Sequence, residues 1–318
     1  MALTEQPAAE HEALRTGAGL IDRSERGKLA LTGAEAKAFL DAQVTNDVIG
    51  LSPGEGRYAA FLTPKGKMLG DLRILDLGDE LFLDTERVSL QGLFNLIRRA
   101  SIGWDAELHK RTVQRGLLSL LGPQARAVAR AEDLPATEHS NAAAQLGGIA
   151  VHLVVTDAGV DVLCDAADTV AVGTELRARG ALPVGEDAAE TLRVERVRPR
   201  YGLDLDDTTI PQEAGLNERA VSFTKGCYPG QETVARLHYR GKPNRHLRGL
   251  RLSAPATPGD ELRLGPKVVG RVGSVAVSPD LGPLALALVR REAEPGSTVA
   301  VGDDQGTAEV VDLPFHAG

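Results

Sequence analysis

Hydrophobic and polar positions follow the same order twice in the first two thirds of the chain. In the first run, a short apolar strand leads into a helix that opens on the capping-box pattern Thr32-Gly33-Ala34-Glu35. A hairpin, a second amphipathic helix and a last strand follow. The members of this run are residues 28–31, 36–44, 57–62 with 67–75, 88–97 and 106–108. The order strand, helix, hairpin, helix, strand is that of a split βαβ, or ferredoxin-like, unit.

The second run repeats this order after residue 112. Its members are residues 116–121, 123–131, 149–155 with 160–164, and 169–179. The pattern therefore predicts two related α+β units with a boundary near residue 112. The residues up to about Gly19 are polar and alanine-rich, and we expect a loose arm there.

From Leu247 onward, short alternating runs are separated by glycine and proline turns. Even spacing of short strands is typical of a small β-barrel. The predicted fold class is thus α+β: two ferredoxin-like units forming the core of residues 1–245, and a C-terminal β-barrel over residues 246–318.

Composition excludes several classes of protein. The formal net charge of the 318 residues is −8, which argues against a protein that coats nucleic acid or an anionic membrane. Two cysteines do not make a disulfide framework, and the first residues lack the apolar stretch of a secretory signal, so we expect a cytoplasmic location. The chain has no C-x-x-C, H-E-x-x-H or phosphate-loop motif, and no bound metal is expected.

The segment Thr224–Glu232 concentrates reactive chemistry around Cys227. Pro229-Gly230 predicts a type II turn, followed by a short helix that Gly241 ends. Cys227 precedes that helix and lies two residues from Lys225, and both features favour a thiolate. A structural cysteine is normally embedded in apolar sequence, as Cys164 is, so Cys227 is the candidate for a redox, ligand or nucleophile role.

Other polar residues allow two interpretations each. Asp71 is either a functional carboxylate or an exposed aspartate at a strand edge, and Glu195 is either a ligand group or a member of an ordinary helix ion pair. The segment from Thr233 to Gly259 contains no acid; it is either a site for an anionic ligand or a solvated basic edge. A role as an accessory in RNA modification would rest on this local charge alone.

The octapeptide K-G-C-Y-P-G-Q-E, residues 225–232, resembles the signature of the YgfZ family. These are folate-binding proteins that help to maintain iron–sulphur enzymes, and they are related to the T-protein of the glycine cleavage system, a tetrahydrofolate-dependent aminomethyltransferase. Residues 43–48, Q-V-T-N-D-V, and residues 202–216, which include Asp204 and I-P-Q-E-A-G-L, resemble elements shared with the T-protein. The resemblance extends over nearly the whole chain.

The resemblance implies a site for tetrahydrofolate or a derivative. Tyr58 and Asp71 match the T-protein's folate-site tyrosine and catalytic aspartate, and Glu195 matches the glutamate that holds the pterin ring. A carboxylate suits that task because it can accept two parallel hydrogen bonds. Gly230 and Glu232 match the ends of the T-protein's G-x-E element, with Gln231 between them. The cysteine is not a T-protein feature.

The sequence therefore predicts a tetrahydrofolate-binding protein that assists assembly or repair of iron–sulphur enzymes. Its expected partners are reduced folate and iron–sulphur enzymes or assembly proteins, without a membrane and without direct binding of nucleic acid. The alternative is a folate-dependent aminomethyltransferase. The candidate residues are Cys227 and Asp71 for catalysis, and Tyr58, Asp71, Glu195, Gln231 and Glu232 for the folate.

Overall fold

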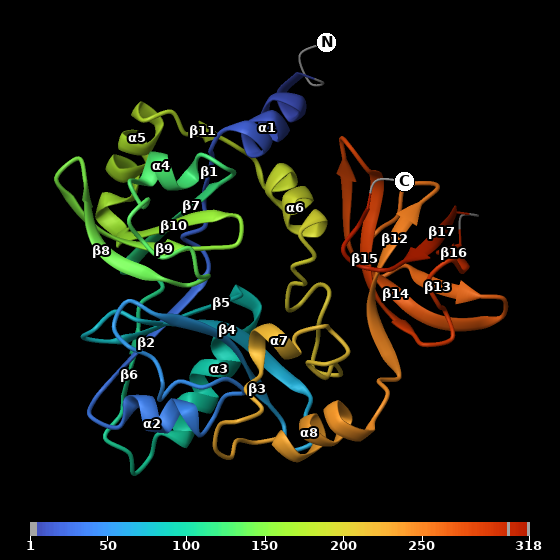
Figure 1. The fold of residues 1–318 in the computed structure, drawn as a ribbon, viewed down its shortest axis with the longest axis horizontal. Helices are drawn as coiled ribbons and strands as arrows, with labels where there is room; N and C mark the ends of the chain where they lie inside the picture. The colour runs from blue at the N-terminus through green and yellow to red at the C-terminus, as the bar shows by residue number, and fades with distance from the viewer. Residues whose placement is uncertain (1–4, 304–305, 317–318) are drawn as a thin grey trace. The chain divides into compact units, whose positions relative to one another are not determined.

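The computed structural model describes residues 5–303 and 306–316, drawn in Figure 1. The chain divides into two compact units. The first contains the residues up to Phe61, with Gly70–Ala189 and Thr224–Tyr228, and the second contains Leu62–Leu69, Glu190–Phe223 and the residues from Pro229 onward. The boundaries at residues 112 and 245, which rest on sequence pattern, stay predictions.

The first sheet lies in the first unit and has five strands. Their order is β3 (Gly56–Leu62), β4 (Met68–Asp76), β5 (Leu81–Thr85), β2 (Gly27–Thr32) and β6 (Glu107–Lys110). The helices α2 (Ala36–Asp41) and α3 (Arg87–Ala100) bury the apolar face of their turns, with Phe39, Leu93 and Ile97 at most 1% exposed. The predicted strands are confirmed here, but β5, which is central to the sheet, was not predicted.

The second sheet, also in the first unit, has six strands. Their order is β11 (Leu182–Pro183), β1 (Gly19–Asp22), β7 (Arg115–Leu121), β10 (Gly159–Asp165), β9 (Ile149–Val155) and β8 (Asn141–Leu146). The helices α4 (Ala125–Ala129) and α5 (Thr169–Ala178), with a 3₁₀ turn at Ala166–Asp168, belong to the same half of the unit. Val172 and Leu176 of α5 join the apolar core of this sheet.

Two local predictions are wrong. The expected N-terminal arm contains helix α1 (Glu5–Thr16), which buries Ala13 and Leu14; residues 1–4 lie outside the described part of the chain. The expected capping box does not form, because Thr32 is the last residue of β2 and its hydroxyl lies 2.7 Å from Nε2 of His109. Both sheets also exceed the four strands of a split βαβ unit, so the count of two ferredoxin-like units stays a prediction.

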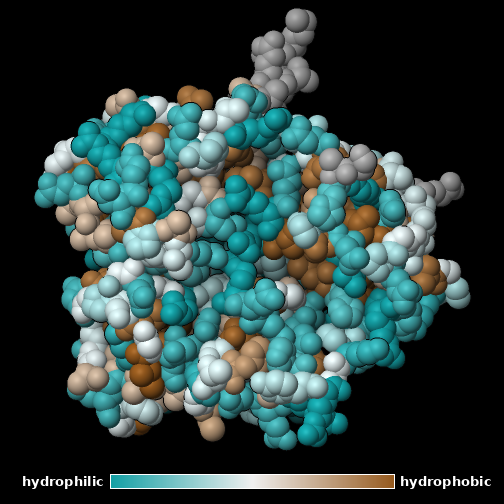
Figure 2. All heavy atoms as spheres, in the orientation of Figure 1, coloured by the Kyte–Doolittle hydropathy of each residue, from teal (hydrophilic) through white to brown (hydrophobic). Residues whose placement is uncertain are grey.

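The predicted C-terminal barrel is confirmed. Six strands close in the order β12 (Arg245–Leu252), β15 (Gly282–Arg290), β14 (Lys267–Ser278), β13 (Glu261–Leu264), β16 (Thr298–Val301) and β17 (Gly306–Val311). Alternate residues such as Leu250, Val299 and Val310 fill the interior, as the alternation of small barrels requires. Figure 2 shows brown, hydrophobic atoms at the surface over the barrel as well.

Three more helices complete the described chain: α6 (Glu186–Glu195), α7 (Asn217–Ala220) and α8 (Gln231–Arg240). The helix predicted to end near Gly241 is confirmed, with Gly241 as its C-cap in extended conformation. The visible face of α8 is hydrophilic in Figure 2. Within the described residues, no helix is long and apolar enough to cross a membrane.

Candidate functional site

Asp71 and Tyr58 form a hydrogen-bonded pair on the neighbouring strands β4 and β3. The Tyr58 hydroxyl donates to Oδ2 of Asp71 at 2.5 Å. Asp71 is only 5% exposed, so it is not the exposed aspartate at a strand edge that the sequence left open. Burial raises the pKa of Asp71 to about 6, although the Tyr58 hydroxyl acts in the opposite direction. Asp71 is therefore a carboxyl group that is shielded from water and has a pKa within about one unit of neutral pH.

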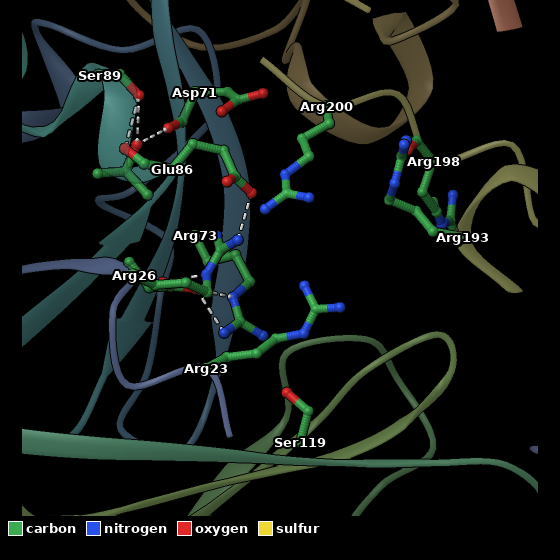
Figure 3. Close-up of polar contacts among 12 residues, drawn as sticks. Arg23, Arg26, Asp71, Arg73, Glu86, Ser89, Ser119, Arg193, Arg198 and Arg200 are labelled. Carbon is green, nitrogen blue, oxygen red and sulfur yellow. Dashed lines mark hydrogen bonds and ion pairs between the residues drawn. The ribbon is translucent and has the colours of Figure 1, made fainter. Parts of the chain in front are cut away.

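The backbone at Asp71 is anchored to the junction of β5 and α3. The hydroxyl of Thr85 donates to the Asp71 carbonyl oxygen at 2.6 Å and lies 3.1 Å from the hydroxyl of Ser89. Ser89 in turn donates to the Glu86 carbonyl oxygen at 3.1 Å. Figure 3 shows Asp71 next to Ser89 and Glu86, above the guanidinium groups of Arg73 and Arg26. The position of Asp71 thus depends on the helix start as well as on its own strand.

Next to this pair lies a buried network of alternating charges. Nε of Arg26 binds Oδ1 of Asp84 at 2.8 Å, and its Nη1 binds Glu86. Nε of Arg73 binds the other Asp84 oxygen at 2.6 Å, and Nη1 of Arg73 reaches Asp161 at 2.5 Å. Asp161 also accepts a hydrogen bond from the hydroxyl of Ser119 at 2.6 Å. Since Asp84 is on β5 and Asp161 on β10, the network joins the two sheets of the first unit.

The pKa values of two buried carboxylates on the adjacent strands β4 and β5, Asp71 and Asp84, are shifted in opposite directions. Burial alone would raise the pKa of Asp84, but the guanidinium groups of Arg26 and Arg73 lower it to about 2. Asp71 lacks such a bond and stays near 6. Pairs of titratable groups whose environments separate their pKa values are typical of acid–base sites. Asp71 is the member of this pair that can exchange a proton at physiological pH.

The other candidate residues for the folate belong to the second unit. Glu195 is the half-buried last residue of α6, and Gln231 and Glu232 are the first two residues of α8. Among the residues that the structure describes, the Glu195 carboxylate has no hydrogen-bond or ion-pair partner. The structure thus brings Tyr58 and Asp71 together, while their assembly with Glu195, Gln231 and Glu232 into one folate site stays a prediction.

Arg193 fixes the end of α6, a role that the sequence did not reveal. Its guanidinium binds Glu190 at 2.7 Å and Asp204 at 2.9 Å. Asp204 also accepts hydrogen bonds from the amide and the hydroxyl of Ser274, both at 2.8 Å, where the register of β14 shifts. Arg193, two residues before Glu195, and Asp204 therefore act together and hold the last turn of α6, which contains Glu195.

Lys225 anchors the Q-V-T-N-D-V loop instead of serving Cys227. Its ammonium donates to the carbonyl oxygens of Val44 at 2.9 Å and Asn46 at 3.0 Å, and to that of Asp41, and its side chain is 2% exposed. Because these acceptors take its three N–H groups, Lys225 has none left to hydrogen-bond the Cys227 thiol, and an effect of its charge on that thiol stays a prediction. Cys227 itself is exposed, unlike the buried Cys164.

Gly230 meets two requirements at the start of α8. Its φ of 84° and ψ of −1° are those of the second central residue of a type II turn, as predicted. A Cβ there would also lie 2.5 Å from the carbonyl oxygen of Thr63. Any side chain at this position would displace the turn, so glycine is required on both grounds.

The chain matches known protein families along most of its length. The GCVT N-terminal domain matches residues 2–225, and the glycine cleavage T-protein C-terminal barrel domain matches residues 245–316. The chain belongs to the glycine cleavage T-protein family. Its domains are thus those of a folate-binding type of protein. The narrower assignment to the YgfZ family, based on the octapeptide, stays a prediction.

Individual members of the T-protein family match along most of their length. The chain is 30% identical to the aminomethyltransferase of Rubrobacter xylanophilus, covering 97% of this chain and 86% of that protein. It is 31% identical to the aminomethyltransferase of Geobacillus kaustophilus, covering 96% and 89%. The crystal structure of glycine cleavage system aminomethyltransferase T from Bartonella henselae has the same fold, with a TM-score of 0.85, 24% identity and coverage of 98% and 90%.

Proposed function

We propose that this chain binds tetrahydrofolate and transfers a one-carbon unit to it from an aminomethyl donor. The observation that carries the proposal is Asp71, a buried carboxyl group with a pKa of about 6 that accepts a hydrogen bond from Tyr58. Membership of the T-protein family supports the proposal, and so do the relatives named aminomethyltransferase. These observations favour one-carbon transfer over the iron–sulphur role that the octapeptide led us to expect.

The residues present suit a reduced folate. The amino-pyrimidinone edge of a pterin offers parallel N–H donors, and Glu195 offers a half-buried carboxylate that has no partner among the described residues. When bound, tetrahydrofolate supplies the nitrogens N5 and N10, which take up the carbon of a donor X–CH₂–NH₂ as a bridging methylene while X–H and ammonia leave. Glu195 would hold the pterin, with Gln231 and Glu232 as further candidates.

Asp71 would manage the protons of this exchange. With a pKa of about 6 its carboxylate is mostly ionised at neutral pH, so it can take a proton from the attacking nitrogen and return it to the leaving ammonia. The Tyr58 hydroxyl occupies Oδ2, which leaves Oδ1 for that proton. Burial keeps bulk water from competing for it.

The test of catalysis is formation of methylenetetrahydrofolate from an aminomethyl group carried on the thiol of a lipoyl arm. We expect folate-dependent turnover in the unaltered protein and a loss of about 10²–10⁴-fold in Asp71→Asn, the range for removing a general acid–base group. Asp165→Asn, at an exposed strand residue, is the control and should retain activity. Absence of turnover in the unaltered protein, or its persistence in Asp71→Asn, would contradict the proposal.

The test of binding is titration calorimetry with tetrahydrofolate. Glu195→Ala should weaken binding by about 1.5–3 kcal/mol, the range for a hydrogen bond to a charged group. Glu294→Ala, which removes an exposed carboxylate of the barrel unit, should leave the affinity unchanged. Equal affinities of the two variants would remove Glu195 from the folate site without touching the assignment of Asp71.

A second candidate function is supported by the exposed thiol of Cys227 in the YgfZ-like octapeptide. In this role the chain would bind folate and assist iron–sulphur enzymes or their assembly proteins, as a binding factor without one-carbon turnover. Cys227→Ser should then fail to restore iron–sulphur enzyme activity in a deletion strain, whereas Asp71→Asn should restore it. The opposite pattern would leave one-carbon transfer as the function.

A further inference from the structure

A cavity of about 330 Å³ lies in the first unit, between its two sheets. One side is formed by the connection from β4 to β5 and by β5 itself, and the other side by strands of the second sheet. None of the residues discussed above as folate contacts lines it. Its volume is at the lower end of the range for sites of small molecules, about 300–1,000 Å³.

Small side chains on one face of the second sheet leave this space open. The strand register places Leu163 of β10 and Ala143 of β8 opposite His152 of β9, so the three side chains share one face. Leu163 packs there in a hydrophobic cluster with Leu117 and with Phe82 of the first sheet. Toward β8 the layer ends in Ala143, whose methyl group is too short to continue it, and the cavity lies there.

One wall of the cavity is apolar. Phe82, Leu163 and Val151 are buried and line it, and Leu77 packs against the same cluster as Phe82. Apolar area that a ligand places against these side chains is removed from water, which favours binding. This wall therefore suits an aromatic ring or a branched aliphatic group.

His152 offers a hydrogen-bond acceptor that its neighbours define. Nδ2 of Asn141 donates to the carbonyl oxygens of Glu55 at 2.9 Å and His139 at 3.1 Å, so Oδ1 is the acceptor of that amide. Nε2 of His152 lies 2.7 Å from this oxygen and must donate to it. Burial and the charge of Arg115 lower the pKa of His152, so the ring is neutral at pH 7 and its Nδ1 is an unprotonated acceptor.

The charged residues of the lining leave one carboxylate without a partner. Nη1 of Arg115 binds Oδ1 of Asp165 at 3.1 Å, so this pair compensates itself and is not assigned to a ligand. The carboxylate of Asp79, between β4 and β5, has no hydrogen bond or ion pair within the described residues. It is close enough to His152 to raise the pKa of that ring against the two opposing influences. A carboxylate and a neutral imidazole acceptor thus lie near each other in one cavity.

We propose that this cavity binds a small organic ammonium ion, a primary amine that carries an aromatic or branched aliphatic group. The ammonium group donates an N–H to Nδ1 of His152 and lies against the carboxylate of Asp79, while the apolar group packs on Phe82 and Leu163. A carboxylate ligand is disfavoured, because Asp79 would repel it and Nδ1 of His152 has no proton to donate. The site does not depend on the proposed folate chemistry.

The probe is benzylamine, which is protonated at neutral pH, titrated calorimetrically into the full chain at pH 7.5. Benzyltrimethylammonium has the same ring and charge but no N–H, and it should bind at least about tenfold more weakly, as expected for the loss of a hydrogen bond to a charged group. Benzyl alcohol keeps a donor but lacks the charge, and it should bind about three- to fivefold more weakly. Tetrahydrofolate should not compete with benzylamine.

Two substitutions separate the charge from the acceptor. Asp79→Asn should weaken benzylamine about three- to fivefold, while Asp133→Asn, at an exposed aspartate outside the cavity, should have no effect. His152→Phe should weaken benzylamine at least about tenfold and leave benzyltrimethylammonium within about twofold. A merely structural role of His152 would not produce this difference between the two cations.

Ala143→Leu tests the cavity without touching the bond between His152 and Asn141, and it decides if His152→Phe lowers the unfolding midpoint. Ala143 is exposed on β8, so a larger side chain can be accommodated there, and leucine should fill the space and weaken benzylamine at least tenfold. Ala300→Leu, at an exposed alanine of the barrel strand β16, is the matched control.

Equal affinities for benzylamine and benzyltrimethylammonium, or equal losses of both in His152→Phe, would overturn the proposal. Unchanged binding of benzylamine in Ala143→Leu would do the same. Competition by tetrahydrofolate would also overturn it, because the cavity would then belong to the folate site. Failure of the folate assays leaves this test intact.

Discussion

The surroundings of Asp71 and of Cys227 differ in almost every physical respect. Asp71 is buried, hydrogen-bonded through its side chain and its backbone, and next to a network of ion pairs. Cys227 is exposed, in a glycine-rich turn whose neighbour Lys225 is committed elsewhere. Burial within the chain raises the pKa of Asp71, so no other molecule is needed for that property. The exposed Cys227 thiol, in contrast, can react only with a molecule that reaches it from outside.

The segment of Cys227 is nonetheless firmly held. Lys225 joins it to the loop of residues 41–46, and Asn46 continues the connection by donating to the Tyr58 carbonyl oxygen at 2.9 Å. The Q-V-T-N-D-V loop thus lies between the cysteine segment and the strand of Tyr58. Substitutions of Lys225, of Asp71 and its partner Tyr58, and of Cys227 test this difference between the two regions.

The largest effect on stability is expected from Lys225→Met. The change leaves three carbonyl oxygens and Asp41 without their buried cation, and removing one partner of a buried charge pair costs about 3–5 kcal/mol. Urea denaturation measures the loss in the free energy of unfolding. Lys242→Met is the matched control, because Lys242 is exposed, and it should change that free energy by less than about 0.5 kcal/mol. Similar losses in both variants would show that Lys225 is not an anchor.

Asp71→Asn should stabilise the protein at neutral pH. The pKa of Asp71 is raised in the folded chain from 3.8 to about 6, so its favourable contribution exists below pH 3.8 and is lost as pH rises through 6. Asparagine is never ionised and can still accept from Tyr58. The variant should therefore match the unaltered protein near pH 4 and exceed its stability by up to about 3 kcal/mol at pH 7.5. A constant difference between the two pH values would contradict the raised pKa.

Tyr58→Phe should have an intermediate effect. The Tyr58 hydroxyl bond lowers the pKa of Asp71, so its loss should raise that pKa further above its ordinary value. The acid limb of the turnover profile should move to higher pH, and the free energy of unfolding should fall by about 1 kcal/mol. Tyr239→Phe, at an exposed tyrosine of α8, is the control. An unshifted profile would show that the hydroxyl does not act on Asp71.

The smallest effect on stability is expected from Cys227→Ser, within about 0.5 kcal/mol, because the thiol is exposed. In the folded protein, iodoacetamide should modify Cys227 and spare the buried Cys164, as mass spectrometry of timed samples can show. Equal modification of both cysteines under native conditions would mean that the second sheet opens. A large loss of stability in the serine variant would instead make Cys227 structural.

Periodicity predicted the elements that have one polar face. The barrel strands alternate, and the helices bury a single stripe, so the pattern identifies them. Strand β5 was missed because all five of its residues are buried, which removes the alternation that marks a strand. The arm at the N-terminus was misread for a related reason: its helix is mostly polar and buries only a few residues, such as Ala13 and Leu14.

The site was predicted only in part, because its partners are distant in sequence. Tyr58 and Asp71 are 13 residues apart, and a hairpin brings such positions together. Lys225 and Asp41 are 184 residues apart, and the link from Arg73 to Asp161 joins different sheets. No local pattern encodes such pairs. Lys225 is two residues from Cys227 in the sequence, but its N–H groups bind carbonyl oxygens of Asp41, Val44 and Asn46, which no local pattern indicates.

The bridge from Arg73 to Asp161 also limits how this protein can be taken apart. A fragment ending near residue 112 would contain the hydrogen-bonded residues Tyr58 and Asp71. It would also contain the neighbouring ion pair of Arg73 and Asp84. It would nevertheless lack Asp161, leaving a guanidinium group half-matched at a newly exposed surface. The two sheets are thus not interchangeable modules, and the reactive half cannot be transplanted without the half that carries none of the candidate residues.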